Sequence, residues 1–254
     1  MNHREPASAE SSSNLKSLFF ENLAVVIAAG GVGRRFSENK NKLFISIGSE
    51  PVFIKTLKNI LEFTFPENIY LSINPQFEEQ YLDNLQKYLQ NESGRINIVH
   101  GGRTRMHSVY NALCRIPDST EYTAVHDAAR PFAGYEIFFN CLQAAGKYGS
   151  AVPAKKITDT LKRTDENNFI IENIDRENVW AVETPQIFPH HRLFEAYKSA
   201  FKKKLTSTDD AGIMEYSGYT PYILHNPLFN IKITFEEDIS RTAYNQPASD
   251  KHTG

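Results

Sequence analysis

The chain has 254 residues, of which 41% are hydrophobic and 23% are charged, so it can form one large α/β domain or two small ones with a substantial core. The formal net charge of −2 gives no overall positive field, which argues against a nucleic-acid-binding protein. Any phosphate site must therefore be a local cluster of basic residues. No apolar run approaches the length needed to cross a membrane, so we expect no membrane association.

The two ends of the chain are polar. Residues 1–14 are rich in serine and contain Glu5 and Glu10, which is typical of a disordered tail and unlike a secretory signal or an organelle transit peptide. We therefore expect a cytoplasmic protein with a disordered tail at 1–20, a single domain at 21–246 and a second tail at 247–254. Cys114 and Cys141 lie in apolar, helix-like contexts, which predicts buried free thiols.

The most informative stretch begins the domain. Residues 23–29 form an apolar run without charge, as in a strand of a parallel sheet that is buried on both faces. The run ends in three glycines and two arginines, Gly30, Gly31, Gly33, Arg34 and Arg35. Bare backbone N–H groups and guanidinium groups in such a turn can bind phosphate oxygens, so we interpret it as a triphosphate-binding loop. The alternative is a tight glycine turn with surface arginines, because the spacing matches neither common glycine motif for phosphates.

Alternating helices and strands follow. Pro51 opens a predicted helix, after which we expect a strand at 68–73, a helix at 78–89 and a strand at 95–99. A second glycine turn then leads into a helix that ends near residue 113. Thr104 is its expected cap, and Arg103 and Arg105 lie at its positive N-terminal end. This turn is a further candidate anion site, and an ordinary strand-to-helix turn with exposed arginines is the alternative.

Asp127 follows the fourth predicted strand, at 122–126. The carboxyl end of a central strand is where open α/β sheets bind ligands, and a carboxylate that faces a triphosphate suits a hard cation such as Mg²⁺. Alternatively, Asp127 caps the turn or pairs with Arg130. We expect the preceding His126 to pack and hydrogen-bond rather than to act as a base. A helix at 137–147 and a strand at 150–154 come next.

Residues 158–176 differ in texture from the rest of the chain. They are polar and rich in strand-forming residues, with a turn at 164–168, which predicts a hairpin arm that stands off the sheet. Because an isolated hairpin is marginally stable in water, we expect the arm to pack on a second subunit. The chain returns to the core at 179–188 and continues with helices at 191–203 and 208–216. Asp209 and Asp210 are expected to cap the second helix, and the alternative is that one of them reaches the hydroxyls of a bound acceptor or the metal region. Strands at 219–224 and 228–234 and a helix at 235–244 close the domain.

A set of motifs runs through the domain in a consistent order: Ala29-Gly-Gly-Val-Gly-Arg-Arg-Phe, Gly101-Gly-Arg-Thr-Arg with Ser108, Val125-His-Asp-Ala-Ala-Arg-Pro, Asp159-Thr-Leu-Lys-Arg, Asp175-Arg176, Thr184-Pro-Gln-Ile-Phe, Thr208-Asp-Asp-Ala and Asn230-Ile-Lys-Ile-Thr. Over residues 23–244, this set resembles the 2-C-methyl-D-erythritol 4-phosphate cytidylyltransferase family. The resemblance implies a Rossmann-like α/β nucleotidyltransferase fold, with a mostly parallel sheet in three layers and a protruding β-arm through which two copies form a homodimer.

The resemblance also implies the reaction and the residues that perform it. The enzyme would join CTP to 2-C-methyl-D-erythritol 4-phosphate with the help of Mg²⁺, releasing pyrophosphate, in isoprenoid precursor synthesis. Arg35, Lys42 and Lys232 would be catalytic, and Asp127 would bind the metal. The nucleotide would contact Ala29, Gly30, Gly31, Gly33, Gly102, Arg105, Ser108 and Ala128. The acceptor would contact Arg130 and, from the arm of a partner subunit, Thr160 and Arg176.

The sequence departs from the usual family pattern at the first loop. Gly30 stands where the family usually has alanine and Phe36 where it has methionine, so the loop also resembles that of D-ribitol-5-phosphate cytidylyltransferases. Asn41-Lys42-Leu43 replaces the usual Pro-Lys-Gln. Ribitol 5-phosphate is therefore the alternative acceptor. Ala128-Ala129 and the motif that begins at Asp159 nevertheless favour 2-C-methyl-D-erythritol 4-phosphate. A nucleotide-binding module without catalysis is a third alternative, which the basic residues of the loops argue against.

Overall fold

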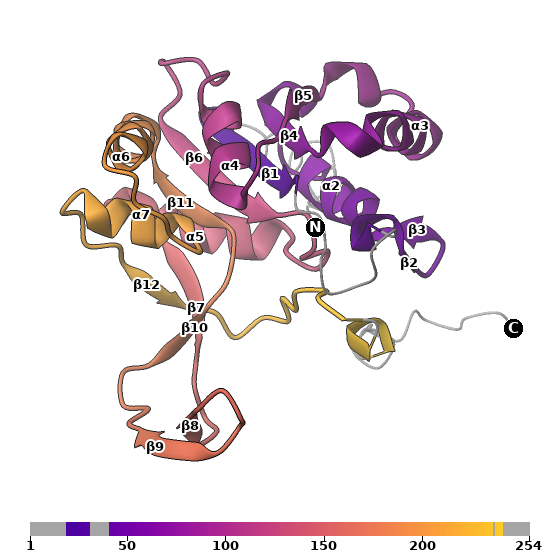
Figure 1. The fold of residues 1–254 in the computed structure, drawn as a ribbon. Coiled ribbons are helices and arrows are strands. Elements are labelled where there is room, and N and C mark those ends of the chain that lie inside the picture. The colour runs from indigo at the N-terminus through magenta and orange to yellow at the C-terminus, as the bar shows by residue number, and fades with distance from the viewer. Residues whose placement is uncertain (1–18, 31–40, 236, 241–254) are drawn as a thin grey trace, which may run out of the picture.

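The computed structural model describes residues 19–30, 41–235 and 237–240 (Figure 1). In this part of the chain, the main sheet has five strands in the order β11-β6-β1-β4-β5. Four of them are parallel: β1 (Leu23–Ala29), β4 (Ile69–Ile73), β5 (Asn97–His100) and β6 (Tyr122–Asp127). The edge strand β11 (Gln186–Pro189) runs antiparallel to β6. The sheet is therefore mostly parallel, as the sequence predicted.

Strand β1 lies at the centre because its residues are apolar on both faces. Leu23, Val25, Ile27 and Ala29 belong to the hydrophobic cluster on one side of the sheet, whereas Ala24 and Val26 belong to the cluster on the other side. Period-two alternation in a strand without polar residues thus fills two cores at once. This is the physical basis of the three-layer arrangement.

Helices cover both faces of the sheet. The first cluster contains residues of α2 (Val52–Leu61), α3 (Glu78–Tyr88) and α5 (Tyr135–Tyr148). The second contains residues of α4 (Arg105–Leu113), α6 (His190–Lys202) and α7 (Asp210–Tyr216). Short 3₁₀ helices and a small hairpin complete this body: η1 (Lys42–Phe44), η2 (Pro66–Asn68), η3 (Pro75–Phe77), η4 (Ser93–Arg95), β2 (Ser46–Ile47) and β3 (Glu50–Pro51).

A second, smaller sheet leads to the arm. Strand β7 (Val152–Lys156) pairs antiparallel with β10 (Trp180–Val182) and parallel with β12 (Ile223–His225). Beyond it, β8 (Leu161–Thr164) and β9 (Ile170–Ile174) form an antiparallel hairpin that stands away from the body in Figure 1. The hairpin expected from residues 158–176 is therefore present.

The end of the chain differs from the prediction. Residues 228–234 are irregular and form no strand, because their hydrogen bonds go to scattered partners instead of one neighbouring strand. Arg130 Nη1 donates to the carbonyl of Asn230, and the N–H of Ile233 donates to the carbonyl of Ala129. Of the helix predicted at 235–244, residues 237–240 are helical, and 236 and 241–244 lie outside the described residues.

Two further positions, Phe20 and Cys114, differ from the prediction. Phe20, placed by the sequence at the end of a tail, is fully buried and packs against Phe63 and Tyr135, so the folded core includes it. Cys141 is buried as predicted, but the prediction for Cys114 was wrong: it follows the last residue of α4 and is exposed. In the described part of the chain, no helix is both long and apolar enough to cross a membrane.

Candidate functional site

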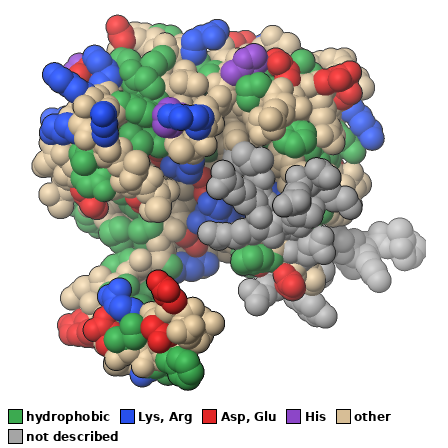
Figure 2. Space-filling model, viewed as in Figure 1, with side chains coloured by type: hydrophobic (Ala, Val, Ile, Leu, Met, Phe, Trp, Pro, Cys, Tyr) green, Lys and Arg blue, Asp and Glu red, His purple; other side chains and the backbone are tan. Residues whose placement is uncertain are grey.

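The candidate site lies at the edge of the main sheet where the parallel strands end. Register pairs Ala28 with Asp127 and Ile73 with His100, so the segments after β1, β5 and β6 meet at this edge. Figure 2 shows basic and acidic side chains gathered in the hollow between the body and the arm. Carboxyl ends of parallel strands are the usual ligand-binding edge of an open α/β sheet.

Glycines let the segments after β1 and β5 approach each other closely. A Cβ added at Gly30 would lie 2.6 Å from the Oγ of Ser108, and one at Gly102 would lie 2.4 Å from the Cβ of His107. Ser108 is buried; its hydroxyl accepts from the N–H of Gly102 and donates to the carbonyl of Thr104. Ser108 therefore fastens the second glycine turn to the first turn of α4.

Helix α4 begins as the sequence predicted. Thr104 is its N-cap, and its Oγ1 accepts from the N–H of His107 at 3.3 Å. The cap sets Arg105 as the first helical residue and aims it at two acids. Its Nε donates to Asp127 Oδ1 at 3.0 Å, and its Nη2 donates to Asp210 Oδ2 at 2.8 Å.

Asp127 is the most strongly bound charge of the site. Among the described residues, three cationic side chains lie within 4 Å of its carboxylate: Arg105, Lys232 at 2.6 Å and Arg130 at 3.8 Å. Burial alone would raise the pKa of Asp127, but these cations outweigh burial and hold the pKa well below its usual range. Asp127 is therefore a carboxylate throughout the neutral pH range. The pairing with Arg130, given by the sequence as an alternative, is one of the three ion pairs of Asp127.

The sequence predicted a capping role for Asp209 and Asp210, with a contact of one of them to the site as the alternative. Asp209 is the N-cap of α7 as expected, with Oδ1 accepting from the N–H of Gly212 at 3.1 Å. Asp210, by contrast, is fully buried and accepts from Arg105 and from the hydroxyl of Tyr197 at 2.5 Å. The partner of this carboxylate lies 105 residues away in the chain, and no local pattern indicates the pairing.

The segment after β12 brings two more predicted residues together. Lys232 reaches Asp127 Oδ2, and the Nζ of Lys42 donates to the carbonyl of Ile233 at 2.8 Å. Predicted residues that are remote from one another in the chain thus meet at one edge. Arg35, Gly31 and Gly33, which the sequence assigned to catalysis and nucleotide binding, lie outside the described residues.

Two hollows adjoin the Asp127 cluster, which we define as Asp127, Arg105 and Lys232. One, of about 220 Å³, is lined by these residues and by Ala28, Gly30, Lys42, Leu43, Ser108 and Ala129. The other, of about 210 Å³, is lined by the same three and by Arg130, Val182, Glu183, Thr184, Gln186, Thr208 and Asp209. A carboxylate between cations that face two hollows suits a reaction between two anionic substrates.

Other predicted residues lie elsewhere. The side chains of Ala29 and Ala128 are fully buried, and their neighbours Ala28 and Ala129 line the first hollow instead. Thr160 and Arg176 are exposed at the base of the arm, where Arg176 donates to the carbonyl of Thr158. Within one chain, neither arm residue lines a hollow of the Asp127 cluster.

His126 has a structural role, as the sequence predicted. It is fully buried; its Nε2–H donates to the carbonyl of Arg130 at 3.1 Å, and its Nδ1 accepts from the hydroxyl of Thr184 at 3.0 Å. Burial lowers the pKa of His126 to about 4, so the ring is neutral at pH 7. The same Thr184 hydroxyl accepts from the N–H of Asp127, which fixes the backbone beneath the carboxylate.

The side chains of the site offer few ligands for a metal ion. Among the described residues, no group of three or more His, Cys, Asp or Glu side chains could hold one. Asp127 offers one carboxylate at the edge of both hollows. Mg²⁺ commonly binds one or two carboxylates and takes its other ligands from substrate phosphates and water. The residues therefore fit a Mg²⁺ ion that arrives with a phosphate-bearing substrate, and do not form a closed metal cage.

Comparison with known proteins gives a consistent result. A family model described as 2-C-methyl-D-erythritol 4-phosphate cytidylyltransferase matches residues 23–245. Curated relatives of that name include a protein of Caldanaerobacter subterraneus subsp. tengcongensis, 33% identical over 219 residues that cover 86% of this chain and 96% of the relative. Another, from Geobacillus thermodenitrificans, is 36% identical over 218 residues, which cover 86% and 94%.

Solved structures agree with these relatives. The crystal structure of 4-diphosphocytidyl-2C-methyl-D-erythritol synthase from Anaerococcus prevotii is 28% identical, with a TM-score of 0.73, and the match covers 90% of this chain and 98% of that chain. The 2-C-methyl-D-erythritol 4-phosphate cytidylyltransferase of Thermus thermophilus is 26% identical, with a TM-score of 0.71 and coverage of 86% and 95%.

The neutral, buried His126 predicts a specific pH dependence of stability. An unfolded histidine has a pKa near 6.5, so the unfolded chain binds a proton that folded His126 takes up only near its pKa of about 4. The free energy of unfolding should therefore fall as pH drops below about 6.5, and this residue should contribute roughly 2 kcal/mol of the loss between pH 7 and 4.5.

Urea unfolding of the wild type and of His126→Gln at pH 7 and 4.5 measures this contribution, because other titrating groups are common to both proteins. The variant should show a shallower loss with falling pH. An equal loss in both proteins would mean that His126 is not held neutral.

Proposed function

The chain belongs to the 2-C-methyl-D-erythritol 4-phosphate cytidylyltransferase family, and we propose that it joins CTP to 2-C-methyl-D-erythritol 4-phosphate. The products are 4-diphosphocytidyl-2-C-methyl-D-erythritol and pyrophosphate, and the reaction belongs to isoprenoid precursor synthesis. The observation that carries this proposal is the Asp127 cluster, whose cations face two hollows at the carboxyl edge of the sheet. We also propose a cytoplasmic location, because Cys114 and Cys141 are free thiols, as is usual in a reducing compartment.

The proposed chemistry requires charge neutralisation rather than a base. The attacking oxygen of a phosphate monoester is already anionic near neutral pH, so the obstacle is repulsion between two anionic substrates. Preorganised cations lower such a barrier by stabilising charge as it develops on the α-phosphate and the leaving pyrophosphate. His126 is buried, and its two ring nitrogens bond to the carbonyl of Arg130 and the hydroxyl of Thr184, which agrees with a mechanism without a histidine base.

Arg105, Lys42 and Lys232 are the described residues that we assign to this neutralisation. Asp127 and Asp210 hold the guanidinium of Arg105, and Asp127 holds the ammonium of Lys232. Ion pairs that fix donors in place reduce the reorganisation needed during the reaction. We retain Arg35 as a further catalytic residue on the family resemblance alone.

Asp127 is the residue that we propose would hold Mg²⁺. When bound there, the ion would neutralise phosphate charge beside Asp127. Gly102 and Ser108 remain proposed nucleotide contacts, together with Gly30, Ala29 and Ala128, whose backbone lies at the ends of β1 and β6. Arg130 remains a proposed acceptor contact because it lines the second hollow.

We further propose that the arm completes the site of a second copy of the chain. The arm exposes three neighbouring apolar side chains, Phe169, Ile170 and Ile171, at 72%, 66% and 62%. A two-stranded hairpin that exposes such residues is marginal in water alone and gains stability from a partner. In the dimer, Thr160 and Arg176 of one copy would contact the acceptor phosphate in the site of the other.

Ribitol 5-phosphate is the alternative acceptor, because Gly30 makes the first loop resemble that of D-ribitol-5-phosphate cytidylyltransferases. The close approach of Gly30 to Ser108 supplies a local packing reason for glycine that is independent of the acceptor. The methylerythritol acceptor is therefore the one we propose.

The proposed reaction predicts acceptor-dependent release of pyrophosphate. Purified protein with CTP and Mg²⁺ should release pyrophosphate when 2-C-methyl-D-erythritol 4-phosphate is added, and an equal concentration of ribitol 5-phosphate should give little or none. Turnover only with ribitol 5-phosphate would contradict the proposed acceptor. CTP binding without turnover on either acceptor would indicate a non-catalytic nucleotide-binding module.

Lys42→Ala should lower kcat by roughly 10²–10³-fold and leave the KM for CTP within a few-fold, because a cation that acts mainly on the transition state contributes little to ground-state binding. Steady-state kinetics measures both constants. Lys198→Ala is the control, because Lys198 pairs with Glu195 on the surface of α6. A large rise in KM with unchanged kcat would show that Lys42 only binds CTP.

Sharing of sites between subunits predicts complementation. Lys232→Ala and Arg176→Ala should each be nearly inactive, but a refolded equal mixture should recover about a quarter of wild-type activity, because half of the dimers are mixed and each has one intact site. Ile170→Glu with Ile171→Glu should give a monomer by light scattering. Mixtures no more active than their components would contradict the shared site.

A further inference from the structure

Lys232 is held in an irregular segment. Residues 226–234 belong to no helix or strand, and Figure 1 shows them crossing from β12 towards the edge of the body. The ammonium of Lys232 nevertheless lies 2.6 Å from Asp127 Oδ2. A segment without regular backbone hydrogen bonding needs specific side-chain hydrogen bonds, here called anchors, to hold one side chain in place.

Glu183 is the anchor at the start of the segment. It lies between β10 and β11, and only 8% of its surface is exposed. Its Oε2 accepts from the amide of Asn226 at 2.7 Å and from the amide of Asn230 at 3.0 Å. These two asparagines bracket the part of the segment that precedes Lys232. The mechanism described above gives this buried carboxylate no role.

The hydrogen bonds continue from Asn230 towards Lys232. Asn230 is fully buried, and its side-chain amide also donates to the backbone carbonyl of Thr184 at 2.8 Å. The backbone carbonyl of Asn230 accepts from Nη1 of Arg130 at 2.8 Å. Lys232 follows two residues later, and the N–H of Ile233 donates to Ala129 at 2.8 Å. Glu183 is thus linked through Asn230 to the backbone that precedes the lysine, and the bond of Ile233 to Ala129 separately holds the backbone that follows it.

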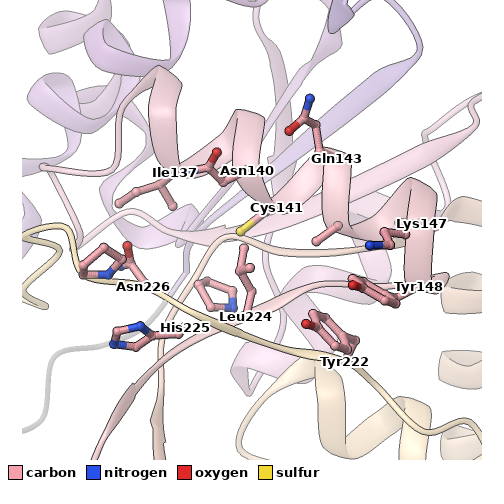
Figure 3. A pocket seen from close by; sticks show the side chains of 13 residues that line it. Ile137, Asn140, Cys141, Gln143, Lys147, Tyr148, Tyr222, Leu224, His225 and Asn226 are labelled. Carbon is pink, nitrogen blue, oxygen red and sulfur yellow. The ribbon is translucent and has the colours of Figure 1, made fainter.

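The opposite side of Asn226 is not closely packed. A cavity of about 330 Å³ lies between α5 and β12, and Asn226 lines it. Figure 3 shows Asn226 and His225 at one end of this cavity and the stacked rings of Tyr148 and Tyr222 at the other. The segment therefore has room to shift on that side, and two hydrogen bonds of Asn226 oppose the shift: that of its side-chain amide to Glu183, and that of its backbone N–H to the carbonyl of Ala154 at 2.9 Å.

We propose that Glu183 is a positioning residue for the reaction: its carboxylate fixes Asn226 and Asn230, and thereby holds Lys232 against Asp127. The inference rests on the proposed function, since Lys232 is assigned there to charge neutralisation. A displacement of about 1 Å at a catalytic group can cost about 10²-fold in rate. Loss of the anchor should therefore lower kcat and leave CTP binding intact.

Two substitutions separate hydrogen bonding from charge. The amides of Asn226 and Asn230 both donate to Oε2 of Glu183. In Glu183→Gln, the amide oxygen can take the place of Oε2 and accept both bonds, and the NH₂ group then takes the place of Oε1. Glu183→Met has similar length and no acceptor, which leaves two buried amides without partners. Glu183→Gln should retain kcat within about threefold, whereas Glu183→Met should lose about 10–100-fold, with the KM for CTP unchanged in both.

A double-mutant cycle with Lys232→Ala tests whether Glu183 acts through the lysine. In the Lys232→Ala background, Glu183→Met should cause no further loss of kcat. An equal loss in both backgrounds would overturn the proposal, because Glu183 lines the second hollow and would then act on the acceptor directly. A Glu183→Gln variant as impaired as Glu183→Met would overturn it as well. If Glu183→Met does not fold, as judged by its Tm, Asn226→Ala removes one of the same bonds and replaces it in the cycle.

A readout without turnover separates this inference from the proposed reaction. Mass spectrometry can follow the rate at which an amine reagent labels Lys232 in the intact protein. Labelling of Lys232 should rise several-fold in Glu183→Met and stay unchanged in Glu183→Gln, with Lys198 as an internal control in all three proteins. Unchanged labelling in Glu183→Met would overturn the proposal whether or not the enzyme turns over the expected substrates.

Discussion

The buried carboxylate of Asp127 is the interaction on which the rest of the site depends. It lies at the carboxyl end of β6 and is surrounded by the cations of Arg105, Lys232 and Arg130. An isolated buried charge is strongly unfavourable, and so is a cluster of cations without an anion. Asp127 and its cations therefore stabilise one another, and Asp127 offsets the repulsion among the three cations.

This charge balance is maintained by elements that are remote from one another in the chain. Thr104 caps α4 and thereby positions Arg105. Asp210, at the start of α7, accepts a hydrogen bond from Nη2 of the same guanidinium. The side chain of Gln186 accepts from the backbone N–H of Asp210, which fastens α7 to β11. The sheet thus supplies the position of Asp127, α4 supplies Arg105, α7 supplies its second counter-ion Asp210, and the irregular segment after β12 supplies Lys232.

The regular part of the fold was predictable because its signals are local. The apolar run of β1, the amphipathic helices and the hairpin at 158–176 all appear where their periodicity and turn residues indicate them. Asp127 and Thr104 were also found, since a strand end and a helix cap are marked by neighbouring residues. The strand predicted at 228–234 does not form, because Asn230 and Ile233 bond to Arg130 and Ala129, which lie in the turn after β6 rather than in a strand.

The sequence by itself determined the alternation of strands and helices, the glycine turn before α4 and the family, because these depend on short-range order along the chain. Only the tertiary structure decided which charges meet. Asp210 was expected to cap a helix and instead holds Arg105, and Glu183 joins two asparagines that lie more than 40 residues further along the chain. Electrostatic and hydrogen-bonding partners are selected by distance in space, and distance in space between remote segments is fixed by packing of the whole sheet rather than by any local pattern.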